Sequence, residues 1–278
     1  IIYMQKREHM NLKKLALGLV ALTSIVTLAA CGSSSSKDTL SKIKDKGTLT
    51  VALSPDYAPF EFQMLKDGKN EIVGSDVDLA NEIGKALGVK VKIQAMDFNN
   101  VLASVTSGKA DIAISGISAD PDRAKSYDFS DSYYTANNVI VVKKEHHDKY
   151  ATIADFKDKK VAAQKGSVQE KVATNQVKGA SLVSLIKTGQ AINELKNGTV
   201  EGVVLEEPIA KSYISANSDL ALSGVKLDSS DTDSYCVAMP KKSDKLKKEI
   251  DLVIKKLKAT DAISQSVEKN FELAQSAK

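Results

Sequence analysis

Apolar positions in the first third of the chain repeat with two spacings, one typical of strands and one typical of helices. Alternating or continuous apolar runs predict three strands, at Thr48–Leu53, Val89–Ile93 and Asp111–Ser115. Between them, apolar residues three or four positions apart predict a helix that Ser75 or Asp76 caps and that ends at Gly88. A second helix is expected over Asn99–Thr106. Because strands and helices alternate, we expect an α/β fold whose neighbouring strands run parallel.

The same order of elements begins again after Tyr134, which predicts a second lobe of similar build. Its strands are expected at Asn138–Val142 and Lys160–Ala163, and a helix is expected to follow Gly166 and Ser167. Residues 101–114 and 191–205 also match each other, since both combine a helix, a glycine, one acidic residue and an apolar strand. The pattern therefore favours two lobes over one large sheet.

The last part of the chain is expected to return to the first lobe. The apolar run Tyr235–Met239 supplies another strand there, and two helices follow it, at Ser243–Lys258 and Ala262–Leu273. Breaks near Thr135–Asn138 and Ser230–Ser234 are the predicted crossovers between the lobes. The predicted division is 39–135 for the first part of lobe I, 136–233 for lobe II and 234–278 for the second part of lobe I.

The N-terminal region follows a different pattern. Lys13 and Lys14 precede the apolar stretch Leu15–Ala30, and the residue after its small-residue end is Cys31. A basic start, an apolar middle and a small-residue end predict a secretory signal. The segment Leu28-Ala29-Ala30-Cys31 resembles a bacterial lipobox, which implies that Cys31 is lipidated and becomes the first residue of the mature protein.

The alternative for this region is an uncleaved membrane anchor. It is disfavoured because the apolar stretch has 16 residues, whereas about 20 are needed to span a bilayer. Met10 is the predicted start of translation. Residues 1–30 are therefore interpreted as an upstream segment and signal peptide, and 31–38 as the lipidated cysteine and a flexible Gly/Ser tether.

Charge and cysteine content exclude several classes of partner. The formal net charge of +4 falls to +1 over residues 31–278, because the basic surplus lies mostly before Cys31. The mature chain is thus too weakly basic to predict binding to nucleic acid or acidic lipid. With Cys31 lipidated, Cys236 has no partner for a disulfide, and its apolar run predicts a small buried side chain rather than a reactive thiol.

Arg123 is the only arginine after residue 30, where every other basic residue is a lysine. A single arginine in such a composition suggests a task that lysine cannot perform, namely planar, bidentate recognition of a carboxylate or phosphate. The segment Ser115–Ser118 follows a predicted buried strand, at the sheet edge where ligands of α/β proteins usually bind. Asp120 and Pro121 then begin a helix that places Arg123 in its first turn. A purely structural arginine remains the alternative.

Further polar and aromatic residues follow other predicted strands. Gly166 and Ser167 offer a second anion site at a helix start, and Glu206 follows a strand where it could hold an ammonium group, although a solvated acidic pair is equally compatible. Tyr57 and Phe98 follow strand ends in the first lobe, with core packing as the default interpretation. Together, an anion holder, a cation holder and aromatic walls describe a pocket for a free amino acid.

Several ordered segments between about Gly47 and Phe271 resemble the polar amino-acid-binding proteins of ABC importers. The segments that carry the resemblance are Tyr57–Phe62, Val73–Ala80, Ser115–Ser118 with Arg123, and Tyr127–Ser130. The resemblance implies the type II periplasmic-binding fold, an α/β fold of two Rossmann-like lobes joined by a two-strand hinge. It further implies a non-enzymatic protein that closes its lobes on an amino acid and delivers it to a membrane permease driven by an ATPase.

The resemblance also assigns roles to individual residues. It implies that Arg123 clamps the α-carboxylate, helped by Ser118 and by N–H groups at Ser167 or Val168. Glu206 would pair with the α-ammonium, with the Gly116 carbonyl nearby, and Ser115 belongs to the same segment as Gly116. Tyr57 and Phe98 would enclose the ligand side chain.

The chain departs from the family pattern at Ser54, where many members carry an aspartate that grips a basic or amide side chain. Asp56 and Glu61 are candidates to substitute for it, or are simply solvated. Aromatic walls that can stack on a guanidinium favour a polar, cationic ligand. Which amino acid is bound, and whether cystine, a peptide or another small solute is the cargo, stays open at this stage.

Two other classes of function remain as alternatives, an enzyme and an adhesin that reuse the same fold. The mature chain has only two histidines, the adjacent His146 and His147, and no other histidine or cysteine at ligand spacing, so neither metal nor cofactor is expected. Fold alone does not exclude catalysis. We expect a monomer, anchored through Cys31 to the extracellular face of the cell membrane of a Gram-positive bacterium.

Overall fold

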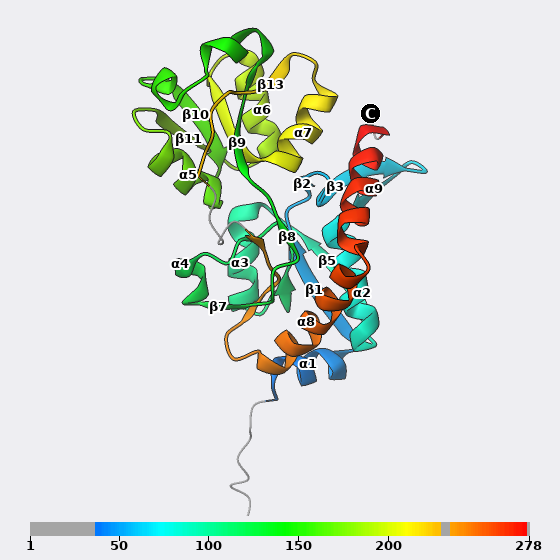
Figure 1. The fold of residues 1–278 in the computed structure, drawn as a ribbon. Helices are drawn as coiled ribbons and strands as arrows, with labels where there is room; N and C mark the ends of the chain where they lie inside the picture. Colours follow the sequence, from blue (N-terminus) through cyan, green and yellow to red (C-terminus); the bar gives the residue numbers. More distant parts are fainter. Residues whose placement is uncertain (1–36, 229–233, 277–278) are drawn as a thin grey trace, which may run out of the picture. The chain divides into compact units, whose positions relative to one another are not determined.

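A computed structural model describes residues 37–228 and 234–276, so the predicted signal, Cys31 and the tether up to residue 36 lie outside the described residues. The described strands form two five-stranded sheets, together with one three-stranded and one two-stranded sheet (Figure 1). The first large sheet has the order β5 (Lys90–Ala95), β1 (Thr48–Leu53), β6 (Ile112–Ala113), β15 (Ala238–Pro240) and β7 (Tyr127–Phe129). Strand β1 pairs in parallel with β5 and β6, as the alternation of elements predicts.

The second large sheet repeats this plan. Its order is β11 (Ser181–Leu185), β10 (Lys160–Gln164), β12 (Gly202–Glu206), β9 (Asn138–Lys143) and β13 (Leu220–Leu222). Strand β10 pairs in parallel with β11 and β12, and β9 runs antiparallel to β12 and β13. In the first sheet, β15 likewise runs antiparallel to β6 and β7. The late strand β15 therefore returns to the first sheet, as predicted.

Helices accompany each sheet. The helices that precede or follow strands of the first sheet in the sequence are α1 (Thr39–Lys46), α2 (Ser75–Leu87), α3 (Phe98–Thr106), α4 (Pro121–Ala124), α8 (Asp244–Ala259) and α9 (Ala262–Ser276). Those that connect strands of the second are η1 (Lys144–Lys149), η2 (Ile153–Phe156), α5 (Val168–Gln176), α6 (Thr188–Asn197) and α7 (Glu207–Ala216). Helices α8 and α9, drawn in orange and red in Figure 1, both pack on α2. Buried Ile83 of α2 and Ile250 of α8 belong to the same apolar core.

The start of α2 differs from the prediction in a way that matters for the site. The capping residue is Gly74, with φ of 135°, and neither Ser75 nor Asp76 caps the helix. Glycine is required there because a Cβ at Gly74 would lie 2.0 Å from the Phe60 carbonyl oxygen. Asp76 is thereby placed inside the first turn, with its carboxyl group fully buried.

A β-hairpin was not predicted from the apolar pattern. Strands β3 (Glu61–Lys66) and β4 (Lys69–Val73) pair antiparallel, and the short β2 (Asp56–Tyr57) adds to β3. The turn residues Asp67 and Gly68 have φ of 51° and 75°, and an Asp-Gly pair with both φ values positive is a strong hairpin signal. The signal was therefore present in the sequence, and the hairpin delivers Asp56, Tyr57 and Glu61 to the site.

The predicted crossovers are only partly described. Strand β8 (Tyr134–Thr135) leads into β9 of the second sheet and pairs antiparallel with β14 (Ser234–Tyr235), which leads back to β15 of the first sheet. Most of the second crossover, at Ser230–Ser234, lies outside the described residues. Residues Asp38–Lys278 form one compact unit, and the division into moving lobes stays a prediction.

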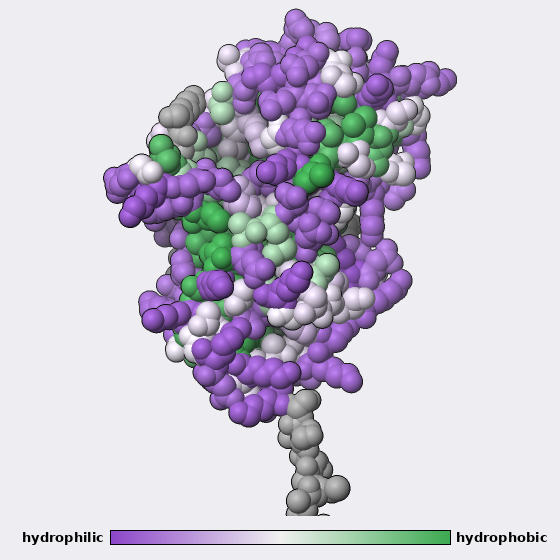
Figure 2. Space-filling model, turned by 180° about the vertical axis from the view of Figure 1, so that it is seen from behind, coloured by the Kyte–Doolittle hydropathy of each residue, from purple (hydrophilic) through white to green (hydrophobic). Residues whose placement is uncertain are grey.

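The surface of the described chain is mainly polar. Seen from behind, hydrophilic residues cover most of the molecule and hydrophobic residues show as separate patches (Figure 2). Large exposed apolar side chains come from different elements, with Leu65 on β3, Leu182 on β11 and Leu252 on α8. Among the described helices, none combines the length and apolar character needed to cross a membrane. Cys236 is buried, as predicted, and burial raises the pKa of its thiol to about 11.

Candidate functional site

A cavity of about 10 Å³, room for about one water molecule, lies between residues of the first and second sheets. Its walls come from the segments that follow β1, β5, β6 and β10, and from the first turn of α5. The lining residues are Ser54, Asp56, Tyr57, Glu61, Phe98, Ser115, Gly116, Gln164, Ser167 and Gln169. Polar groups at the carboxyl ends of parallel strands are the usual ligand-binding feature of α/β proteins.

The structure brings six of the predicted site residues into this lining: Ser54, Tyr57, Phe98, Ser115, Gly116 and Ser167. Ser118 and Arg123 lie next to it, since Arg123 stacks over the ring of Phe98 at 5.9 Å from its centroid. Val168 is the first residue of α5, directly after Ser167. Glu206 is not among the lining residues of this cavity.

Short hydrogen bonds fix the polar side of the cavity. The Ser115 hydroxyl donates to Glu61 Oε1 at 2.6 Å and accepts the Ser54 N–H at 3.0 Å. The Ser54 hydroxyl donates to Asp56 Oδ1 at 2.9 Å. Because both serine side chains are already hydrogen-bonded and buried, they hold the two acidic residues in place.

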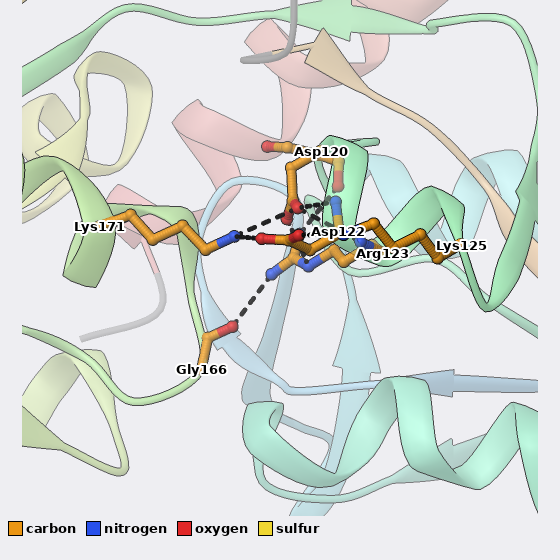
Figure 3. A network of polar contacts seen from close by, with 7 residues as sticks. Asp120, Asp122, Arg123, Lys125, Gly166 and Lys171 are labelled. Carbon is orange, nitrogen blue, oxygen red and sulfur yellow. Dashed lines mark hydrogen bonds and ion pairs between the residues drawn. The ribbon is translucent and has the colours of Figure 1, made fainter.

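The site has two halves, one formed by residues that follow strands of the first sheet and one by residues that follow strands of the second. Arg123 contacts both of them (Figure 3). Its Nη1 donates to the Ser118 carbonyl at 2.8 Å, and its Nη2 donates to the Gly166 carbonyl at 3.0 Å. Its Nε lies 3.2 Å from Asp120 Oδ2. These contacts use three of its five N–H groups, which leaves donors for a carboxylate. Burial lowers the pKa of Arg123, and the neighbouring Asp120 opposes this effect and keeps the guanidinium charged.

The helix that carries Arg123 begins as the sequence predicts. Asp120 is the N-cap of α4, its side chain accepts the N–H groups of Asp122 and Arg123, and Pro121 follows at the first helical position. Asp120 also binds Lys171 of α5, whose Nζ lies 3.2 Å from Asp120 Oδ1 and 3.0 Å from Asp122 Oδ2. Hydrogen bonding to Asp122 and Asp120 outweighs partial burial and raises the pKa of Lys171. A charged bridge thus connects α4 with α5.

Asp56 makes a second connection between the halves. Its Oδ2 accepts the N–H of Thr188, the first residue of α6, at 2.8 Å, and the Gln164 side-chain amide at 3.4 Å. Burial raises the pKa of Asp56, and the hydrogen bonds from Thr188 and Ser54 oppose that rise. The start of a helix favours a negative charge, so this carboxylate sits where an anion is stabilised.

Gly116 packs under the Tyr57 ring. Its φ is +54°, and a Cβ there would lie 3.2 Å from Tyr57 Cε1 and 3.5 Å from the Tyr235 ring. A glycine is required for both the backbone conformation and the close approach. The Tyr57 ring is itself buried, so the tyrosine forms a fixed wall rather than a mobile lid.

Replacing Gly116 with alanine should therefore affect binding as well as stability. We expect Gly116→Ala to lower the free energy of unfolding by about 1–2 kcal/mol through its backbone conformation, and also to weaken ligand binding by displacing Tyr57. Gly108→Ala is the matched control, because Gly108 has φ of +72° with nothing within 4 Å of its Cβ position. Chemical denaturation and calorimetry measure both quantities. Equal dissociation constants for the two variants would contradict the proposed contact.

Glu206 is buried at the end of β12 and forms the N-cap of α7. Burial, followed by the nearby Glu206 carboxylate, raises the pKa of Tyr235. The Tyr235 ring lies close to Gly116 of the cavity lining. The ammonium-binding role of Glu206 stays a prediction.

Two lining residues were missed from the sequence, Gln164 and Gln169. Both are buried, and Gln169 donates to Asn138 Oδ1 at 2.9 Å. Gln164 directly follows the buried apolar run Val161–Ala163, which is the available signal for it. The alternative that Glu61 is solvated is wrong, because its side chain is fully buried. Among the described residues, no group of three or more histidine, cysteine or acidic side chains is placed to hold a metal.

The chain is similar to known proteins over most of its length. The model of the bacterial extracellular solute-binding proteins, family 3, matches residues 49–273. The arginine-binding extracellular protein ArtP of Bacillus subtilis is 36% identical over 211 residues, which cover 75% of this chain and 79% of that protein. The L-cystine-binding protein TcyA of Bacillus subtilis is 29% identical over 269 residues, 94% of this chain and 98% of that protein.

A solved structure is similar over nearly its whole length. The amino acid ABC transporter substrate-binding protein AbpA from Streptococcus pneumoniae, bound to L-arginine, has 48% sequence identity and a TM-score of 0.82. The match covers 84% of this chain and 98% of AbpA.

Proposed function

The chain belongs to the bacterial extracellular solute-binding proteins, family 3, and from this premise we propose that it captures arginine and delivers it to an ABC importer. As a member of this family, it is an amino-acid-binding protein and not an enzyme. The fold is the two-sheet α/β arrangement of the type II periplasmic-binding proteins. The observation that carries the choice of a cationic ligand is the Asp56 carboxylate in the cavity wall.

Asp56 supports arginine because its charge is not cancelled by a direct ion pair among the described residues. Its partners there are neutral donors, the Ser54 hydroxyl, the Thr188 N–H and the Gln164 amide. A cationic side chain placed beside this carboxylate gains a charge-assisted hydrogen bond in a site shielded from water. Asp56 thereby takes over the role of the aspartate that many relatives carry at the position of Ser54.

The remaining parts of the ligand have their own partners. Arg123 supplies a guanidinium for the α-carboxylate, and the N–H groups at the start of α5 lie beside Gly166, which Arg123 already contacts. Glu206 is the proposed partner of the α-ammonium. Tyr57 and Phe98 line the same cavity and would flank the aliphatic part of the ligand. The carboxylate is thus recognised in the same way for every amino acid, and the side-chain end sets specificity.

Lobe closure is the proposed mechanism. The cavity of about 10 Å³ is smaller than an amino acid, so the two halves must separate to admit one. We propose that residues 39–135 with 234–278 move as one lobe and 136–233 as the other, bending at β8 and β14. Contacts across the site, including those of Arg123 with Gly166 and of Asp56 with Thr188, would form on closure.

The bridge from Lys171 to Asp120 and Asp122 is expected to stabilise the closed form. Lys171→Ala should speed arginine dissociation about two- to fivefold at low salt, because a half-exposed ion pair contributes modestly and is screened by salt. Stopped-flow measurements at low and high salt test this. Lys178→Ala, an exposed lysine that follows the same helix, is the control. A dissociation rate equal to that of the unchanged protein at low salt would show that the bridge does not stabilise the closed form.

A thermal-shift screen tests the proposed ligand. Arginine at a hundredfold excess over its dissociation constant should add about 2.7 kcal/mol of stability, because it binds only the folded protein. The screen uses all twenty amino acids, cystine and citrulline. A shift with arginine that exceeds every other supports the proposal. A larger shift with cystine or glutamine would keep solute binding and overturn the specificity, and no shift with any compound would contradict both.

We also propose that Cys31 carries a lipid anchor on the extracellular face of the cell membrane. The support is the lipobox-like sequence and the Gly/Ser tether that follows it. Two acyl chains hold a protein stably at a membrane surface. Cys31→Ala should therefore release most of the protein from the membrane fraction into the medium, and should abolish incorporation of labelled palmitate. Persistent membrane association of an unlabelled variant would contradict the anchor.

A further inference from the structure

Two fully buried carboxyl groups lie at the cavity: Glu61 belongs to its lining, and Asp76 contacts the lining residue Gly116. Glu61 begins β3, and Asp76 lies in the first turn of α2. Asp76 Oδ2 accepts the N–H of Gly116 at 2.9 Å and the hydroxyl of Tyr133 at 2.8 Å. Glu61 Oε1 accepts the Ser115 hydroxyl at 2.6 Å. The two acids therefore hold the two consecutive residues, Ser115 and Gly116, that line the cavity.

The other oxygen of each carboxyl group has no conventional donor. Glu61 Oε2 and Asp76 Oδ1 are buried, and neither is reached by a hydroxyl, amide or backbone N–H of the described residues. No lysine or arginine of the described chain forms an ion pair with either group. Two ionised carboxylates in such a place would repel each other without compensation. The side chains of Glu61 and Asp76 interact directly with each other, so one proton between them would satisfy both remaining oxygens.

We propose that Glu61 and Asp76 share a single proton, and that this pair positions the Ser115–Gly116 segment for ligand binding. The positioning part rests on the proposed function, whereas the shared proton is a property of the protein without ligand. Neither acid needs to touch the ligand. Both act through the segment that they hold.

The surroundings indicate where the proton lies. Asp76 accepts two hydrogen bonds and sits at a helix start, which favours its charged form, so Glu61 Oε2 carries the proton and donates it to Asp76 Oδ1. Burial first, and then the Asp76 charge, raises the pKa of Glu61 well above its usual value. Burial raises the pKa of Asp76 to about 6, although its hydrogen bonds oppose the rise.

The other titratable groups that face the pair reinforce this assignment. They are Asp56 of β2 and the hydroxyls of Tyr133 and Tyr235. Asp56 raises the pKa of Glu61 further. The pKa values of both tyrosines are raised first by burial and then by nearby acidic groups, which include Asp76 and Glu61. None of them is a cation. A neutral Glu61 also leaves Asp56 as the charged acid of the cavity wall, in agreement with its proposed contact to a cationic side chain.

Replacement of Glu61 by glutamine distinguishes a protonated Glu61 from an ionised one, because glutamine mimics the protonated acid. Its carbonyl can accept the Ser115 hydroxyl and its amide can donate to Asp76. In the unfolded chain Glu61 ionises above about pH 4.3, while in the folded protein it keeps its proton. Folding then takes up a proton. The stability conferred by this group therefore falls as the pH rises from the unfolded pKa of about 4.3 towards the raised pKa of Glu61 in the folded protein. Glu61→Gln has no such loss.

The melting temperature of Glu61→Gln minus that of the unchanged protein should therefore rise by at least about 5 °C between pH 5 and pH 8. Glu71→Gln, an exposed change on the neighbouring strand β4, is the control and should run parallel to the unchanged protein. A difference that stays constant with pH for Glu61→Gln would overturn the shared proton.

Binding at pH 7 tests the positioning role. Glu61→Ala should raise the dissociation constant for arginine at least about tenfold, and Glu61→Gln should restore it to within about threefold of the unchanged protein. A loss of more than tenfold in Glu61→Gln would show that an ionised Glu61 contacts the ligand, and would overturn the proposal. If the alanine variant does not fold, the glutamine variant alone decides. Failure of the unchanged protein to bind arginine would instead reject the proposed function, and the melting experiment would still decide on the proton.

Discussion

Arg123→Lys should raise the dissociation constant for arginine at least about 100-fold, which corresponds to about 2.8 kcal/mol. The two terminal nitrogens of the guanidinium donate hydrogen bonds to the Ser118 and Gly166 carbonyls, and its Nε forms an ion pair with Asp120. A lysine keeps the charge but cannot hold these groups and a ligand carboxylate together. Isothermal titration calorimetry measures the loss.

The control for this variant is Lys125→Ala, two residues further along the chain. Lys125 is exposed and pairs only with Asp122 among the described residues, so its removal should change the dissociation constant by less than about twofold. A cooperative melting transition in Arg123→Lys shows that the fold is retained. Near-normal affinity in that folded variant would remove Arg123 from the site.

Asp56→Asn should raise the dissociation constant for arginine at least about 30-fold, or about 2 kcal/mol, because a shielded charge pair loses one partner. Asparagine keeps an acceptor for the Thr188 N–H, so the contact with α6 is preserved. Citrulline has nearly the shape of arginine but no side-chain charge. The affinity of Asp56→Asn for citrulline should differ from that of the unchanged protein by less than about threefold. The ratio of the arginine and citrulline affinities therefore measures the contribution of the charge pair with Asp56.

Asp67→Asn is the matched control for Asp56→Asn. Asp67 lies in the exposed β3–β4 turn with φ of 51°, a conformation that asparagine also tolerates. It should leave both affinities unchanged. An equal loss for arginine and citrulline in Asp56→Asn would mean that Asp56 acts through the structure and does not contact the cationic end. The affinity for arginine should also fall as pH falls through the raised pKa of Asp56, because its protonated form carries no charge.

The arrangement of strands could be predicted because the strands of each large sheet are apolar runs that alternate with helical patterns in the sequence. The apolar runs that become β1, β5 and β6 are separated by helices, and this alternation fixes their parallel pairing. The return of β15 to the first sheet followed from one more apolar run. Arg123 could be singled out because no other arginine follows residue 30.

The polar interior of the site could not be predicted in the same way. Glu61 and Asp76 belong to segments of mixed polarity, and nothing in their local pattern indicates full burial. Their burial depends on contacts with Ser115, Gly116 and Tyr133, which are 40 to 57 residues away in sequence. Side-chain hydrogen bonds over such separations follow from tertiary packing and leave no periodic signal.

A crystal structure of residues 37–278 grown with L-arginine tests the central claim most directly. The account predicts the ligand carboxylate on the Arg123 guanidinium, the ligand guanidinium within hydrogen-bond distance of Asp56, and the aliphatic part between Tyr57 and Phe98. A ligand bound with its guanidinium away from Asp56, or bound outside the cavity between the two sheets, would contradict it.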